Sequence, residues 1–208
     1  LVADGLLVES EPGGSAPAPS PSSSASDPER WQGFPAPAGP EAIGVALLAA
    51  FLAWSFLTRG FFAAAVSGAD LVFHEAGHPI LGILGVRFLM YLGGTLAQLA
   101  FPIAAAVSFA RVRRAAPFAV AIVWLGFNLV DVGRYAADAS ARVLPLLAAD
   151  EDSHDWWNML GMLGVRDHCR GIGGTISALG WILWAAAPAW TLWRWWQGRA
   201  RGRAGGGP

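Results

Sequence analysis

The residues best suited to chemistry in this sequence are two histidines and a glutamate within the segment HEAGH. His74 and His78 are four positions apart, so in a helix they share one face, with Cβ atoms about 5 to 6 Å apart. Glu75 follows the first histidine and would project beside an ion bound by both rings. Two imidazoles, a carboxylate and a water molecule suit zinc. The spacing therefore predicts a Zn²⁺ site at His74 and His78, with Glu75 as general base on the zinc-bound water.

The surroundings of HEAGH favour a metal site over a chance match or a pair of packed histidines. The segment lies in a largely apolar stretch, residues 61–86, where ionisable side chains are costly and usually functional. The sequence has 4 histidines, and two of them have this spacing. We therefore expect His74 and His78 to be metal ligands.

A third ligand must come from elsewhere, and the fourth apolar stretch carries a stripe of polar side chains. Asn128, Asp131, Tyr135 and Asp138 are spaced three, four and three residues apart, so they share one helix face. Such a face should point into the protein. Asp131 would lie within about 5 Å of the depth of His74 if both stretches enter from the same side. Asp131 is therefore the preferred third ligand, and Asp138 is the second choice.

Two alternatives concern this third ligand. Asp131 could instead form a salt bridge with Arg134 or Arg87. Asp155 becomes a rival ligand if the stretch between 140 and 171 folds back into the membrane. That stretch could form a second metal site, cover the first or be an ordinary solvated loop, and its other candidate side chains are those of His154, His168 and Cys169.

Gln98 is a candidate for stabilising charge during catalysis. It lies in the third apolar stretch, within GGTLAQLAFP. Its amide could donate a hydrogen bond to an oxyanion formed during peptide hydrolysis, or it could form an ordinary hydrogen bond between helices. We predict Gln98 as a catalytic residue beside Glu75.

The composition indicates that most of the chain lies in a membrane. Hydrophobic residues make up 54% of the 208 residues and charged residues 14%, against about 25% charged in ordinary soluble domains. The formal net charge of -1 provides no basic field for nucleic acid, so we expect no nucleic-acid partner. We predict an all-α, polytopic membrane helix bundle of about five transmembrane helices, at residues 42–57, 61–86, 88–110, 115–137 and 172–196.

The flanking segments complete the predicted organisation. Residues 1–40 are rich in Pro, Ser and Ala and are predicted to be a disordered tail; residues 41–200 form the transmembrane, metalloprotease-like domain, and 201–208 a flexible basic tail. Five spans place the two ends of the chain on opposite sides. Basic loops stay cytoplasmic. We therefore expect a multi-pass protein of the bacterial inner (plasma) membrane, with its N-terminus outside and its C-terminus in the cytoplasm.

Together these motifs resemble the site-2 protease family of intramembrane zinc metalloproteases. In that family one membrane helix carries HExxH, the next a Gly-x-x-x-Asn motif, and a later one an Asn-Pro-x-x-Asp-Gly-like signature whose Asp binds zinc. HEAGH, GTLAQ (94–98) and NLVDVG (128–133) have a similar order here. Gln98 stands in place of Asn, the proline is missing, and the glycine follows Asp131 by two residues. The resemblance covers about residues 61–138 and would make this chain a minimal, divergent member.

The resemblance implies hydrolysis of a peptide bond in or near a transmembrane segment of a substrate protein. The expected partners are the membrane and a transmembrane or membrane-associated protein substrate. The departures at Gln98 and Asp131 leave a second interpretation open, a membrane metal-binding protein without proteolytic activity. A third is a structural membrane protein in which HEAGH has no function.

Overall fold

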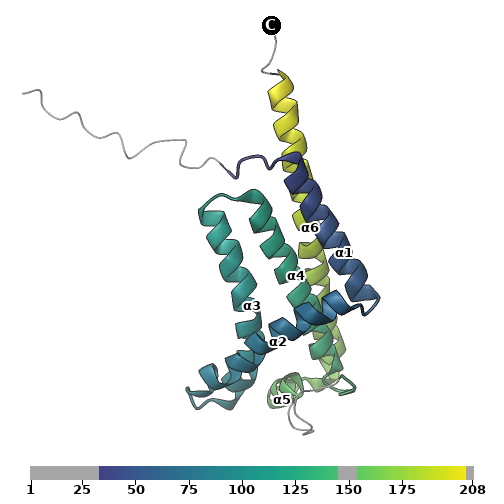
Figure 1. Cartoon of the computed structure of the whole chain (residues 1–208). Coiled ribbons are helices and arrows are strands. Elements are labelled where there is room, and N and C mark those ends of the chain that lie inside the picture. The colour runs from purple at the N-terminus through teal and green to yellow at the C-terminus, as the bar shows by residue number, and fades with distance from the viewer. Residues whose placement is uncertain (1–32, 145–153, 205–208) are drawn as a thin grey trace, which may run out of the picture. The chain divides into compact units, whose positions relative to one another are not determined.

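The computed structural model describes residues 33–144 and 154–204, and within them the chain is entirely helical (Figure 1). The predicted all-α class is confirmed. The elements in chain order are α1 (Gly39–Leu57), α2 (Phe61–Gly82), α3 (Arg87–Arg111), α4 (Ala115–Asp138), α5 (Asp155–Met162), the short 3-10 helix η3 (Arg166–His168) and α6 (Cys169–Ala204).

Tight turns separate the first four helices. The turn after α1 contains Arg59 at φ 55°, and the turn after α3 contains Arg113 at φ 53°. Between α2 and α3, Gly85 takes φ 70°, a left-handed conformation that glycine adopts without steric cost. At the start of α1, the Glu41 carboxylate accepts a hydrogen bond from the Ala38 amide, at 2.9 Å. Short connections of this kind make consecutive helices neighbours in space.

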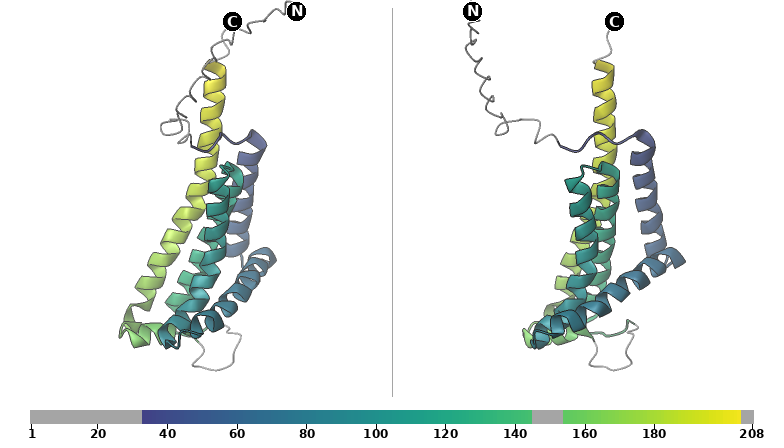
Figure 2. Two further views of the ribbon diagram at one scale, coloured as in Figure 1. Left: turned by 90° about the vertical axis from the view of Figure 1, so that its left-hand side faces the viewer. Right: turned by 60° about the vertical axis from the view of Figure 1, so that its left-hand side comes forward.

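α4 is the central helix of the bundle, and its closest partner is α6. The two helices approach through glycines, because a Cβ at Gly126 would meet the backbone of Gly180, and one at Gly133 would meet that of Gly173. The apolar core lies mainly around α4, where Val123, Phe127 and Val130 are buried. In Figures 1 and 2, α2 runs obliquely across one end of this bundle.

Among the described helices, four are long and apolar enough to cross a membrane: α1, α3, α4 and the segment Arg166–Arg201 that includes α6. Their outward faces carry large apolar side chains such as Leu47, Phe101 and Ile182. α2 is not one of the four, whereas the prediction of about five spans included it. Its polar side chains lower its hydropathy, and one face of it packs on α3.

The first and last helices bear on the predicted arrangement of the chain ends. At the start of α1, a Cβ on Gly39 would touch the Trp195 ring of α6, so the start of α1 and the end of α6 lie at the same end of the bundle (Figure 1). Four crossings, one for each candidate span, would bring the chain back to the side on which α1 begins. The prediction placed these ends on opposite sides.

The boundaries of the bundle differ slightly from those predicted. Phe34 already packs on Phe118 and Trp190, with ring centroids 4.9 and 5.2 Å apart, so the bundle begins before residue 41. α6 continues to Ala204 and takes in half of the stretch predicted as a flexible basic tail. The predicted disorder of residues 1–32 and of 205–208 falls outside the described residues.

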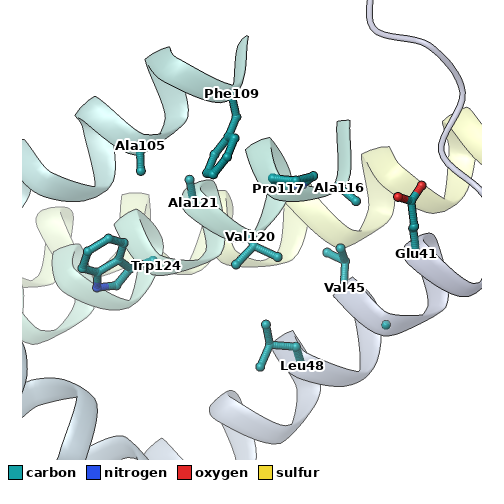
Figure 3. A pocket seen from close by; sticks show the side chains of 11 residues that line it. Glu41, Val45, Leu48, Ala105, Phe109, Ala116, Pro117, Val120, Ala121 and Trp124 are labelled. Carbon is teal, nitrogen blue, oxygen red and sulfur yellow. The ribbon is translucent and has the colours of Figure 1, made fainter. Parts of the chain in front are cut away.

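An apolar cavity of about 540 Å³ lies between α1, α3 and α4 (Figure 3). Leu48, Val120 and Trp124 are among its lining side chains, and Glu41 lies on its wall. No residue of HEAGH lines this cavity.

Candidate metal centre

Three side chains from two helices converge at the end of the bundle crossed by α2. Asp155 Oδ2 lies 2.9 Å from His74 Nε2 and 3.4 Å from His78 Nε2. The three residues form a group whose ligand atoms all lie within 4.8 Å of one another. His74 and Asp155 are buried, and His78 is half-buried. This group could hold a metal ion, as the spacing of HEAGH predicts for its two histidines.

The other nitrogen of each imidazole is held by an acceptor on α3. His74 Nδ1 lies 3.1 Å from Gln98 Oε1, and His78 Nδ1 lies 2.9 Å from the carbonyl oxygen of Met90. Each Nδ1–H can donate to its acceptor, which leaves the Nε2 lone pairs directed at Asp155. Metal-binding histidines are commonly oriented by a hydrogen bond of this kind.

Glycines on α2 and α3 create the space that the imidazoles need. A Cβ on Gly94 would lie 2.5 Å from His74 Nε2, so any larger residue there would collide with the ring. Next to this contact, Gly77 of α2 and Gly93 of α3 face each other so closely that a Cβ on either would meet the other's carbonyl group. The GTLAQ motif therefore has a clear geometric basis: Gly94 makes room for His74, and Gln98 orients it.

The donor set, two imidazoles and one carboxylate, is one that zinc also accepts, so its spacing can be compared with zinc geometry. Four-coordinate zinc binds nitrogen and oxygen at about 2.0 to 2.2 Å, which places neighbouring tetrahedral ligand atoms about 3.4 Å apart. The distance from His78 Nε2 to Asp155 Oδ2 has this value, and the one from His74 is shorter, at 2.9 Å. With two imidazoles and one carboxylate, a fourth position remains for water or substrate.

Asp155, the rival ligand, joins the histidines, and Asp131 does not. The Asp131 carboxylate is instead hydrogen-bonded to Ser67 of α2 and attracted by Arg134. Among the described residues, Asp155 and not Asp131 is therefore grouped with the two histidines. Asp131 shares one face of α4 with the other polar residues and interacts electrostatically with His74, but its carboxylate does not belong to the metal-binding group.

Asp138, the second choice, has a structural role at the end of α4. Its carboxylate accepts hydrogen bonds from the amides of Val143 and Leu144, at 3.1 and 3.0 Å. Its Oδ2 also lies 3.7 Å from His154 Nε2. Asp138 therefore organises the chain that leaves α4.

Glu75 and Gln98 both lie next to the metal-binding group. Glu75 is exposed and close enough to act electrostatically on His74 and Tyr135. Gln98 is buried, and its Oε1 accepts from His74, so its amide nitrogen is the atom that could donate to a substrate. The catalytic roles of both residues stay predictions.

Tyr135 and His154 lie around Asp155; the sequence offered Tyr135 in the polar stripe of α4 and His154 as a candidate of the 140–171 stretch, but gave neither a role at this site. The Tyr135 hydroxyl accepts a hydrogen bond from the Asp155 amide, and His154 caps α5 by accepting from the Trp157 amide at 3.2 Å. Burial lowers the pKa of the His154 imidazole, against the opposing effect of Asp138 and Asp155. The position of Tyr135 in the polar stripe of α4 could have indicated its place near the site. The Met90 carbonyl could not be predicted, because every residue has a backbone carbonyl and the residue type carries no information about it.

The remaining candidates of this stretch lie apart from the site. His168 is exposed at the end of η3, and Cys169 is buried with its Sγ 3.2 Å from Ser140 Oγ. Within the described residues, neither belongs to a metal-binding group.

Comparisons with known proteins returned no matching family profile, no matching curated protein and no matching solved structure.

Proposed function

We propose that this chain is an intramembrane, zinc-dependent endopeptidase that hydrolyses peptide bonds in or near transmembrane segments. The observation that carries the proposal is the convergence of His74 Nε2, His78 Nε2 and Asp155 Oδ2. An exposed glutamate directly follows the first histidine. Four of the described helices are long and apolar enough to cross a membrane, which supports a multi-pass membrane protein.

The site lies nearer to one end of the bundle than to its middle. Gly94, which contacts His74, is seven residues from the Arg87 end of the 25-residue helix α3, or about 10 Å along its axis. The path that water must take to a site at this depth is shorter than the path to a site at mid-bilayer. A transmembrane substrate would be cut near one end of its helix, where unwinding exposes the fewest backbone groups to hydrocarbon.

The chemistry expected at the site follows from the residues present. A zinc ion bound there supplies a Lewis acid that polarises the scissile carbonyl and acidifies water. Glu75 accepts a proton from the attacking water as the C–O bond forms, and donates it to the leaving amine nitrogen as the C–N bond breaks. Gln98 Nε2 is a candidate donor to the oxygen that becomes negatively charged.

The decisive experiment compares wild type with Glu75→Gln in proteoliposomes that contain helical membrane substrates. We expect cleavage by wild type and a loss of at least about 100-fold in Glu75→Gln, the range for removal of a general base. Zinc content should be equal in both proteins, because Glu75 is not one of the converging ligands. Equal cleavage by both would reject the protease mechanism.

The main rival is a metal-binding membrane protein without proteolytic activity. It predicts zinc in wild type, loss of zinc in His74→Ala, and no cleavage by any variant. Absence of metal from purified wild-type protein would reject both functions. The two measurements, metal content and cleavage, therefore separate the three outcomes.

We also propose a location in the bacterial inner (plasma) membrane with the end of α6 in the cytoplasm. Arginines cluster at that end of the bundle, in the turn between α3 and α4 and along the last part of α6. Basic residues beside membrane helices favour the cytoplasmic side. The start of α1 then also faces the cytoplasm, and the metal centre lies toward the outer side.

A further inference from the structure

The Tyr135 hydroxyl contacts the third ligand at two points. It accepts a hydrogen bond from the backbone amide of Asp155 at 3.0 Å, and it donates to Asp155 Oδ2 at 3.4 Å. This Oδ2 is the same oxygen that faces both imidazoles. One phenol therefore holds both the first backbone amide of α5 and the carboxylate that points at the site.

The Tyr135 ring is itself fixed from two sides. It stacks on the His154 ring, with centroids 4.2 Å apart and an interplanar angle of 26°. Its other neighbour is His74, in an edge-to-face arrangement at 6.0 Å. His154 is fully buried and caps α5. The last turn of α4 thus presents a rigid hydroxyl to the start of α5.

Asp155 needs such support more than the two histidines do. The histidines lie on one continuous 22-residue helix, whereas Asp155 is the first residue of an eight-residue helix. Helices this short are marginal on their own, so tertiary contacts must fix the Asp155 backbone. Ordering its side chain also costs rotamer entropy, which a preformed hydrogen bond reduces.

We propose that Tyr135 is a positioning residue of the metal centre, setting both the backbone and the carboxylate of Asp155 for coordination. This inference rests on the metal-binding part of the proposed function and is independent of proteolysis. Tyr135 acts through Asp155, in the way that outer hydrogen-bond partners orient metal ligands.

The test compares Tyr135→Phe with Tyr91→Phe, because the chain has only 2 tyrosines and Tyr91 lies on α3. Zinc affinity is measured in detergent by competition with a chelating dye, and coordination by the absorption of the Co²⁺-loaded protein. We expect Tyr135→Phe to bind zinc about 10- to 100-fold more weakly and to show a changed Co²⁺ spectrum. Tyr91→Phe should match wild type in both measurements.

A double-mutant cycle separates positioning from a general loss of structure. In the Asp155→Ala background, Tyr135→Phe should have no further effect on the residual metal affinity, because its target is gone. The same fold loss in both backgrounds, or wild-type affinity and spectrum in Tyr135→Phe, would overturn the positioning role alone. A wild-type protein that binds no zinc would overturn the metal site together with this role.

Discussion

Each imidazole of the metal centre uses its two ring nitrogens for different tasks. Nδ1 of His74 and of His78 is directed at an acceptor on α3, and Nε2 at Asp155. The helical spacing of HEAGH brings the rings together, with centroids 5.0 Å apart, but does not choose between the nitrogens. That choice comes from the acceptors on the neighbouring helix, Gln98 Oε1 and the Met90 carbonyl.

The identity of the third ligand can be tested directly. We expect Asp155→Ala to lower zinc affinity by more than about 100-fold, a larger loss than that for an outer hydrogen-bond partner. Asp131→Ala should retain zinc, because its carboxylate bonds to Ser67. Zinc content after equilibrium dialysis distinguishes the two. The reverse pattern would show that Asp131 is the ligand.

The space beside His74 gives a second test. Gly94→Ala should push the imidazole out of position and lower zinc affinity by at least about 10-fold. The matched control is Gly68→Ala on α2, where a Cβ would meet nothing within 4 Å. Thermal unfolding of both metal-free variants reports whether the fold itself has changed. Unchanged zinc affinity in Gly94→Ala would show that the ring can move aside without cost.

The sequence allowed part of this site to be predicted. His74 and His78 were accessible because their relation is local and depends only on helical periodicity. Asp155 was uncertain because its position depends on how a separate short helix docks. The choice between Asp131 and Asp155 could not be made from the sequence, because a shared helix face and a similar depth do not specify which side chain of a neighbouring helix Asp131 meets.

At the level of elements, the pairing of α4 with α6 holds the bundle together. Gly126 and Gly133 on α4 face Gly180 and Gly173 on α6, which lets the two backbones approach closely. Small residues serve this purpose in membrane helices, where apolar burial provides little force between helices. Because α4 also carries Tyr135, the pairing of α4 with α6 holds in place the hydroxyl that contacts Asp155.

Substitution along this pairing should destabilise the fold. Gly133→Ala places a Cβ 2.6 Å from the Gly173 carbonyl oxygen, and overpacking of this kind costs about 1 to 3 kcal/mol. Gly174→Ala, on the same part of α6, meets nothing within 4 Å and should be neutral or stabilising by about 0.5 to 1 kcal/mol. Unfolding in detergent, followed by circular dichroism, measures both. Equal stability of the two variants would contradict the close packing.

The helix boundaries were largely predictable, and the character of α2 was not. The stretches 88–110 and 115–137 differ by one residue at most from the bounds of α3 and α4. Apolar length and arginine-bearing turns determine such boundaries. The stretch 61–86 was interpreted as a span, yet Asp70, His74 and Gly77 form a buried face of α2. The lower hydropathy of α2 was available in the sequence, but its oblique course across the end of the bundle depends on packing against α3, which hydropathy does not reveal.

For the whole molecule, the four-span arrangement makes a prediction about sidedness. Val86 and Val112 flank α3 and are 48% and 64% exposed, so each accepts a cysteine without loss of packing. In a Cys169→Ala background, Val112→Cys should react with an impermeant thiol reagent only from the cytoplasmic side. Val86→Cys should react only from the outer side.

A cytoplasmic tag after α6 provides the reference for this experiment. It should be on the same side as Val112→Cys in both intact and inverted vesicles. Labelling of Val86→Cys and Val112→Cys from one side would contradict α3 as a span, and reversal of both would invert the proposed orientation.

Trp124 belongs to two environments at once. It lines the apolar cavity between α1, α3 and α4 (Figure 3), and its indole Nε1 donates to Asp70 Oδ1 at 2.9 Å. Asp70 is 1% exposed and lies one helical turn before His74 on α2. A hydrocarbon chain that entered the cavity and tilted this indole would therefore weaken one hydrogen bond of a buried carboxylate on the helix that carries both imidazoles.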